Sequence, residues 1–389
     1  MRSSRQSLVS SRQSAAESWS SAISRRLAAV SRRSDACAKK SLYSLPTNDC
    51  RPLTAEGRHL RAARFLLTLC FCLAAAGAAS AAEREGRWAI LLAGVSGDPE
   101  LQQLYLKEIA DLHAVLTGPL ELSKDHIMVL VDDPSKRPDL TQRQSTLENL
   151  QTVCRDLAGK VNKEDLVFVF IDGHGSYDGK AYKLNLVGPD PTAEKLAAIL
   201  YSIPAQRFVI LNATNCSGGS VPALSQEGRI VIAATKSGTE KNKTHMGRYF
   251  IDAFANNAAD SDKNGRVSIA EAFSFTKKKV EDYYSGEGNL QTEHPVLDDN
   301  GDAKANDKPS PENGDGLLAA NTFLDAGVPS GIRKGLTAEQ QELERAAREL
   351  EKQIEALKYS KDKMTEAEYE NKLEDLLLRL ARINAKLSN

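Results

Sequence analysis

Five short, unbroken runs of apolar residues, separated by segments of helical pattern, constrain the fold of this 389-residue chain most strongly. The runs carry Val, Ile and Leu in succession, as strands buried on both faces of a sheet do. The segments between them repeat apolar residues every three or four positions. This alternation predicts an α/β domain with a mostly parallel sheet between two layers of helices. We expect strands at 88–93, 127–131, 166–171, 208–211 and 230–234, and helices at 101–116, 147–157 and 193–200.

Two polar loops follow the third and fourth predicted strands. His174 stands between two glycines directly after the third strand, and Cys216 comes 42 positions later, after the fourth. One right-handed crossover fits between them and would make the strands neighbours, with both loops at the carboxyl edge where α/β sheets bind ligands. A His and a Cys at one edge form a base and a nucleophile, because the imidazole takes the thiol proton and the thiolate reacts. The alternative is a Gly-rich turn with an uninvolved His and a buried Cys.

The two motifs, His174-Gly175 and Cys216-Ser217-Gly218-Gly219, resemble those of the legumain-like cysteine peptidases, which have the caspase–hemoglobinase fold. The resemblance covers residues 86–300. It implies a three-layer caspase-like peptidase domain that acts on a peptide or protein substrate. It also implies that His174 and Cys216 form the catalytic dyad, with the amides of Gly175 and Cys216 as oxyanion donors.

The chain departs from that family directly after the cysteine. Legumains carry an acidic residue there, which contributes to an asparagine-selective pocket, whereas this chain has Ser217. We therefore expect cleavage after a polar or charged residue, in a pocket approached by Ser217, Thr235 and Lys236.

Residues 260–271 match the twelve-residue loop that binds calcium between two helices in EF-hand proteins. Oxygen side chains on alternate residues converge on one ion, a glycine at position 6 permits the turn, and a final Glu adds two oxygens. The pattern predicts an EF-hand-like Ca²⁺ site; the alternative is a polar connector between two core helices. The expected ligands are Asp260, Asp262, Asn264, the Arg266 carbonyl, Ser268 and Glu271. Residues 298–302 lack a suitably placed Glu, so we expect a polar turn there.

The start of the chain resembles a targeting segment. An Arg/Ser-rich extension at 1–57 precedes three arginines, an apolar run at 65–76 and small residues up to Ala82, the order of a signal peptide at 58–82. The run is shorter than the ~20 apolar residues that span a bilayer. We expect that the signal peptide is cleaved and that the protein is secreted or periplasmic. We also expect that the start site has been assigned too far upstream, so that residues 1–57 are not part of the working protein. The alternatives are a genuine targeting extension, or an uncleaved anchor that would hold the protein at a membrane.

Charge and cysteine usage narrow the function further. Residues 83–389 carry 38 basic against 48 acidic residues, so we expect no nucleic-acid binding. This part keeps only Cys154 and Cys216, too few for a disulfide framework. Cys154 lies in an apolar helical pattern and is expected to be a small buried hydrophobe.

The end of the chain predicts a helical hairpin. A Gly/Pro/Asp-rich linker at 301–335 leads to 336–389, where apolar residues step by four and three in two helices of similar length. Thr337 with Gln340, and Thr365 with Glu368, match capping boxes at the two helix starts. We expect an antiparallel hairpin or coiled coil, which either packs on itself or mediates self-association or partner binding.

Two hypotheses follow. The first is an exported cysteine endopeptidase with a bound structural calcium. The second is a non-catalytic, calcium-dependent binding or assembly protein on the same caspase-like fold.

Overall fold

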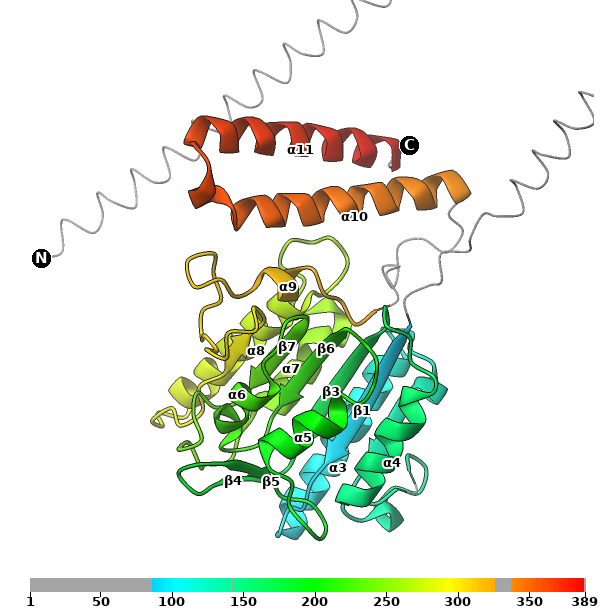
Figure 1. The fold of residues 1–389 in the computed structure, drawn as a ribbon, viewed down its shortest axis with the longest axis vertical. Coiled ribbons are helices and arrows are strands. Elements are labelled where there is room, and N and C mark those ends of the chain that lie inside the picture. The colour runs from blue at the N-terminus through cyan, green and yellow to red at the C-terminus, as the bar shows by residue number, and fades with distance from the viewer. Residues whose placement is uncertain (1–85, 142, 326–336, 388–389) are drawn as a thin grey trace, which may run out of the picture. The chain divides into compact units, whose positions relative to one another are not determined.

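The structure, a computed structural model, describes residues 86–141, 143–325 and 337–387 (Figure 1). All described residues belong to one compact unit, Ala82–Asn389. The predicted extension at 1–57 and the predicted signal peptide at 58–82 lie outside the described residues. Residues 326–335 of the predicted linker also lie outside them. Within the described part, no helix is both long enough and apolar enough to cross a membrane.

A six-stranded sheet forms the centre of the domain, in the order β2-β1-β3-β6-β7-β8. Five strands are parallel and β8 pairs antiparallel with β7. All five predicted strands form, and no observed strand end differs from the predicted end by more than one residue. Their bounds are Arg87–Ala93 for β1, Ile127–Leu130 for β2, Leu166–Asp172 for β3, Arg207–Asn212 for β6, Arg229–Ala233 for β7 and Val296–Asp298 for β8.

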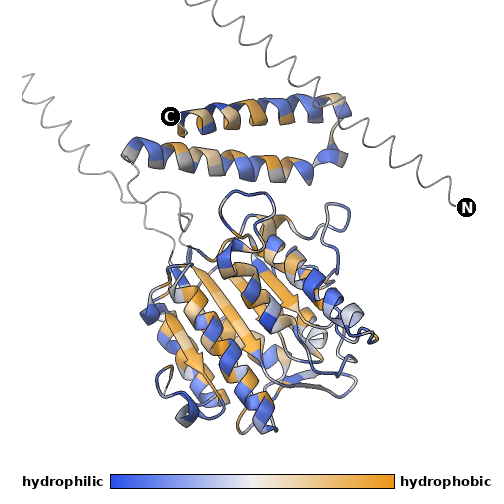
Figure 2. Ribbon diagram, turned by 180° about the vertical axis from the view of Figure 1, so that it is seen from behind, coloured by the Kyte–Doolittle hydropathy of each residue, from blue (hydrophilic) through white to orange (hydrophobic). Residues whose placement is uncertain are grey.

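Helices cover both faces of this sheet, which confirms the predicted three-layer α/β class (Figure 1). Because alternate side chains of a strand point to opposite faces, Phe168 and Phe170 join one core while Val167 and Val169 join the other. The first core is closed by α3 (Pro99–Thr117), α7 (Met246–Phe254) and α8 (Ile269–Gly286). The second is closed by α4 (Leu147–Ala158), α5 (Ala193–Leu200) and α6 (Val221–Leu224). Figure 2 shows the apolar strands between helices whose outer faces are hydrophilic.

The helix ends follow from local chemistry. Asp98 caps α3 by accepting hydrogen bonds from the amides of Glu100 and Leu101, and Pro99 begins the helix. Thr146 caps α4 in the same way through the amide of Asn149. Cys154, on the inner face of α4, is fully buried as expected. Burial raises the pKa of its thiol to about 12, so this cysteine stays protonated and inert.

The C-terminal residues form the predicted hairpin of α10 (Ala338–Lys358) and α11 (Glu366–Leu387) (Figure 1). Both predicted capping boxes form: the Thr337 hydroxyl accepts from the Gln340 amide, and the Thr365 hydroxyl accepts from the Glu368 amide. The two helices bury their apolar faces to different extents. Four of the α10 side chains that the structure describes are buried, whereas the apolar stripe on α11 is only half-buried. The four are Ala347, Leu350, Ile354 and Leu357.

Candidate active site

The loops that carry His174 and Cys216 leave the sheet side by side. β3 and β6 are parallel neighbours, and Ile171 pairs with Asn212 at their carboxyl ends. The predicted adjacency of the two strands is therefore confirmed. Gly173 turns the chain after β3 at φ 122°, a backbone conformation that favours glycine. A Cβ atom there would lie 3.0 Å from the backbone of Gly94 at the end of β1.

Cys216 adopts an unusual backbone conformation. Its φ of 60° and ψ of 5° place it in the left-handed region, where non-glycine residues are uncommon and strained. The residue begins a 3-10 turn, Ser217–Ser220, that the sequence patterns did not predict, and α6 follows directly. Of the two cysteines in the described residues, only Cys216 has this conformation, which five other described non-glycine residues share.

The Cys216 thiol is almost enclosed. Only 1% of the residue is exposed. Burial raises the pKa of the thiol, and the nearby Lys241 ammonium lowers it in part. The Asn215 side-chain amide lies 3.7 Å from Sγ and donates toward it. A thiol in this setting needs both a base and access before it can act as a nucleophile.

His174 is half-buried and is held by its backbone and by a neighbouring ring. Its carbonyl accepts a hydrogen bond from the Asn185 amide at 3.0 Å. The Tyr105 ring of α3 meets the imidazole edge-on, with the ring centroids 6.0 Å apart. β4 (Gly175–Tyr177) begins directly after His174 and pairs with β5 (Tyr182–Leu184), a small hairpin that the sequence patterns also missed.

The two predicted oxyanion donors both have acceptors within the protein. The Gly175 amide donates to Asn215 Oδ1 at 2.9 Å. The Cys216 amide donates to the carbonyl of Glu240 at 2.8 Å. A substrate carbonyl would have to displace both acceptors before these amides could hold an oxyanion. Asn215 and Glu240 were not among the predicted site residues; only Asn215, adjacent to Cys216 in a polar loop, carried a signal that could have identified it.

A network of buried polar side chains supports the loop that carries Cys216. The Tyr182 and Thr214 hydroxyls lie 2.8 Å apart, and Thr214 donates to Asn212 Oδ1 at 2.8 Å. Asn212 in turn donates to the Ser220 hydroxyl at 3.0 Å. Each of these groups is satisfied inside the protein, so the network fixes the loop geometry at Cys216.

The three residues predicted to approach the substrate pocket differ in position. Ser217 and Thr235 are fully buried and face each other, with their hydroxyl oxygens 3.3 Å apart. The Thr235 hydroxyl also accepts from the Gly218 amide at 2.9 Å, so this pair joins the nucleophile loop to the end of β7. Lys236 is exposed and lies with its Nζ atom 3.6 Å from a carboxylate oxygen of Glu240. Of the three, Lys236 alone presents its side chain to solvent.

A pair of buried carboxyl groups lies beneath the His174 loop. Glu108 of α3 and Asp172 of β3 are both buried, and Gly247 leaves room for Glu108, because a Cβ there would lie 2.4 Å from Oε2. Burial, followed by the charge of Asp172, raises the pKa of Glu108, and burial also raises the pKa of Asp172. Asp172 Oδ1 accepts from the Gly173 amide at 2.8 Å, whereas Oδ2 has no hydrogen-bond donor among the described residues. A proton on Glu108 would supply that donor, and the raised pKa of Glu108 favours this protonated form.

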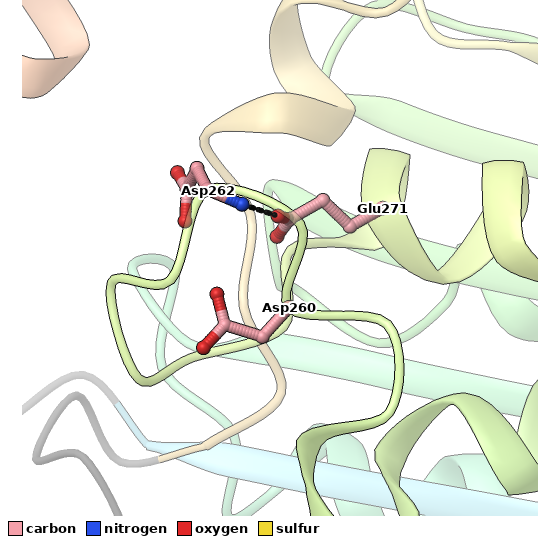
Figure 3. Close-up of side chains that lie close together, drawn as sticks. All are labelled: Asp260, Asp262 and Glu271. Atoms are coloured by element: carbon pink, nitrogen blue, oxygen red, sulfur yellow. Dashed lines mark hydrogen bonds between the residues drawn. The ribbon is translucent and has the colours of Figure 1, made fainter.

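The predicted calcium loop brings its three acidic side chains together. Asp260, Asp262 and Glu271 each offer an oxygen within 4.8 Å of the others (Figure 3). Gly265 turns the loop at φ 83°, and its amide donates to Asp260. Carboxylate and carbonyl oxygens are the ligands that Ca²⁺ prefers, so the donor set fits this ion.

The remaining predicted ligands surround the same loop. Asn264 donates to Asp262 at 2.9 Å, and Ser268 caps α8 through a capping box with Glu271. The Arg266 side chain points to another segment, where it pairs with Asp325 and stacks over the ring of Phe323 at 3.7 Å, so only its carbonyl is available as a ligand. The predicted polar turn at 298–302 forms only in part, because Asp298 is the last residue of β8 and residues 300–302 form a bend after it. Asp299 accepts there from the amides of Gly316 and Ala319.

No protein-family model matches the chain, and no curated protein is significantly similar to it. Similar solved structures include a protein from Geobacter sulfurreducens, at 10% identity and a TM-score of 0.39, which covers 60% of this chain and 97% of its own. They also include drICE, a caspase, at 13% identity and a TM-score of 0.33, which covers 57% of this chain and 90% of its own. Raptor from Chaetomium thermophilum has 11% identity, a TM-score of 0.30, and coverage of 43% of this chain and 17% of its own.

Proposed function

We propose that this chain is an exported cysteine endopeptidase on a caspase-like fold, with Cys216 as the nucleophile and His174 as the base. The observation that carries the proposal is the strained φ of 60° at Cys216, on a loop that is hydrogen-bonded to the residue after His174. An activated thiol requires a base within reach, and this hydrogen bond joins the loop of the His174 imidazole to the loop of the Cys216 thiol.

In the proposed reaction, His174 removes the proton from the Cys216 thiol, and the thiolate attacks the carbonyl carbon of a peptide bond. The resulting oxyanion is stabilised by the amides of Gly175 and Cys216 once their present acceptors have moved. His174 then returns the proton to the amine as the C–N bond breaks, which leaves a thioester on Cys216. Water hydrolyses the thioester, with His174 again as the base, and the free thiol is restored.

Lys236 is the residue best placed to influence which peptide is cleaved. An exposed ammonium beside the site favours an acidic or polar side chain on the substrate. Ser217 and Thr235 contribute indirectly, because they hold the nucleophile loop and the loop after β7 in register.

We propose that the loop 260–271 binds one structural Ca²⁺ through Asp260, Asp262, Asn264, Ser268, Glu271 and the Arg266 carbonyl. The support is the convergence of three carboxylates at the start of α8. A bound ion would offset their mutual repulsion and fix the start of this helix. The chemistry of peptide cleavage does not pass through this site.

A fluorogenic peptide library, presented to the purified full-length protein with millimolar Ca²⁺, tests the proposal. We expect turnover by the parent, and a loss of at least about 1,000-fold in Cys216→Ala and in His174→Ala. Cys154→Ala is the matched control and should retain parent turnover. If Cys216→Ala and the parent cleave equally, the dyad assignment is wrong.

The second candidate is a calcium-dependent binding or assembly protein without catalysis. The enclosure of Cys216 favours it, because a thiol that is 1% exposed cannot reach a substrate without rearrangement. This candidate predicts that no variant cleaves a peptide and that the protein captures a partner only when calcium is present. Deletion of the hairpin of α10 and α11 is the first test of which segment binds that partner.

A further inference from the structure

The segment between β7 and α7 is hydrogen-bonded to the loop that carries the nucleophile. Residues 236–245, named here the covering loop, place two backbone carbonyls on the loop that carries Cys216. The Glu240 carbonyl accepts from the Cys216 amide at 2.8 Å, and the Lys241 carbonyl accepts from the Asn215 side chain at 3.1 Å. These contacts accompany the 1% exposure of Cys216.

The position of the Glu240 carbonyl has chemical consequences. Oxyanion donors act over 2.7–3.1 Å, and the Glu240 oxygen lies at 2.8 Å from the amide that the proposed reaction assigns to this task. A substrate carbonyl and the Glu240 carbonyl therefore compete for the same donor. The covering loop must move before the amide is available.

The side chain of Glu240 fixes the covering loop in this position. It is only 13% exposed, and its carboxylate lies 2.6 Å from Nδ1 of His294. The same carboxylate accepts from the Lys236 amide at 3.0 Å, so one side chain ties the start and the middle of the loop to His294.

The residue before His294 holds the other end. The buried Glu293 carboxylate accepts from the amides of His245 and Met246, both at 2.8 Å, where the covering loop enters α7. Two consecutive residues thus hold the covering loop: His294 contacts its middle and Glu293 contacts its end. They belong to the segment between α8 and β8, which is distant from the loop in sequence.

We propose that the covering loop is an autoinhibitory lid, held closed over Cys216 by the contact between Glu240 and His294. The proposal rests on the proposed function for the meaning of the covered amide, but the coverage itself does not depend on catalysis. Release of the Glu240 side chain frees the carbonyl from the Cys216 amide and exposes the thiol. The closed lid therefore holds the parent at low peptidase activity, and displacement of residues 236–245 raises that activity.

The rate at which iodoacetamide alkylates Cys216 measures lid opening without reference to peptidase activity. Peptide mapping by mass spectrometry of the full-length protein separates Cys216 from the other cysteines. We expect alkylation at least about tenfold faster in Glu240→Ala and in His294→Ala than in the parent, because each removes one partner of the same contact. Asn242→Ala, an exposed position on the same loop, is the matched control and should alkylate at the parent rate.

A second variant is needed because Glu240→Ala could misfold the covering loop, whereas His294→Ala leaves the sequence of that loop intact. The melting temperature of each variant shows whether it is folded. If Cys216 is alkylated at the parent rate in both variants and both are folded, the lid proposal is wrong. Faster alkylation without peptide turnover in any variant supports the lid and refutes the peptidase. Faster alkylation with increased turnover supports both.

Discussion

The amide nitrogen of Gly175 lies 2.9 Å from Asn215 Oδ1, a hydrogen bond between the residue after His174 and the residue before Cys216. The same Asn215 side chain donates through Nδ2 to the Lys241 carbonyl at 3.1 Å and toward Cys216 Sγ. One amide side chain thus joins the base loop, the nucleophile loop and the covering loop. These three loops form a single hydrogen-bonded unit at the carboxyl edge of the sheet.

Replacement of Asn215 by Ala should weaken this unit. The change leaves the Gly175 amide and the Lys241 carbonyl without their partner, and we expect the free energy of unfolding to fall by about 1–2 kcal/mol. Urea unfolding measures the loss, with Asn242→Ala as the control. Equal stability of the two variants would show that the three loops are held by other contacts.

Gly175 should tolerate no side chain. A Cβ atom there would lie 2.4 Å from a ring carbon of Tyr182 and 2.5 Å from the Asn215 carbonyl. We expect Gly175→Ala to destabilise the protein by about 1–3 kcal/mol through displaced backbone and overpacking. Gly159→Ala is the control, because the nearest atom to its Cβ is 3.8 Å away. A Gly175→Ala protein as stable as Gly159→Ala contradicts the described packing.

The buried pair of Glu108 and Asp172 predicts a dependence of stability on pH. The folded state keeps the raised-pKa Glu108 protonated, while the unfolded chain releases that proton above about pH 4.3. The folded state therefore binds more protons, and this contribution to stability is present below that pH and is lost as pH rises through the raised value. Lys243 and Arg248 oppose the shift without reversing it.

Glu108→Gln tests this directly, because the amide still donates to Asp172 but does not titrate. We expect its melting temperature to fall less steeply than that of the parent between pH 5 and about pH 9. Glu100→Gln, at an exposed position in the first turn of the same helix, should follow the parent curve. Parallel curves for parent and Glu108→Gln would mean that the pair does not share a proton.

Calcium should stabilise the folded protein. An ion that binds only the native state adds RT ln(1 + [L]/Kd), about 2.7 kcal/mol at a hundredfold excess over Kd. We expect millimolar Ca²⁺ to raise the melting temperature, Mg²⁺ to do less because its small octahedral shell suits the loop poorly, and Glu271→Gln to remove most of the gain. Asp282→Asn, an exposed acidic residue on the same helix, is the control. Calorimetry without a heat of binding would reduce the loop to a polar connector.

The sequence predicted the sheet well because unbroken runs of Val, Ile and Leu are typical of strands that are buried on both faces. It missed β8, whose three residues carry no periodic signal, and the short strands β4 and β5. The convergence of Asp260, Asp262 and Glu271 was predictable, because all three lie within twelve positions of the sequence.

The environment of the candidate dyad was not predictable in the same way. Glu240 contacts Cys216 from a loop after the next strand, and His294 contacts Glu240 across 54 positions. No local pattern encodes such pairings, which arise when the sheet brings distant loops to one edge. Ser217 and Thr235 were expected beside the substrate, but their hydroxyls satisfy each other in the interior. Glu108 offered a weak signal, as an acidic residue between the buried Leu106 and Ile109.

The most direct test of the central claim is the fraction of Cys216 that a peptidyl vinyl sulfone modifies, measured by mass spectrometry of the full-length protein. The probe reacts with a thiolate that is oriented toward a bound peptide, so it reports the dyad and the site together. The account predicts complete modification at Cys216 in the opened variant Glu240→Ala, little in Glu240→Ala combined with His174→Ala, and none at Cys154. Modification of Cys216 that does not depend on His174, or equal modification of Cys154, would contradict it.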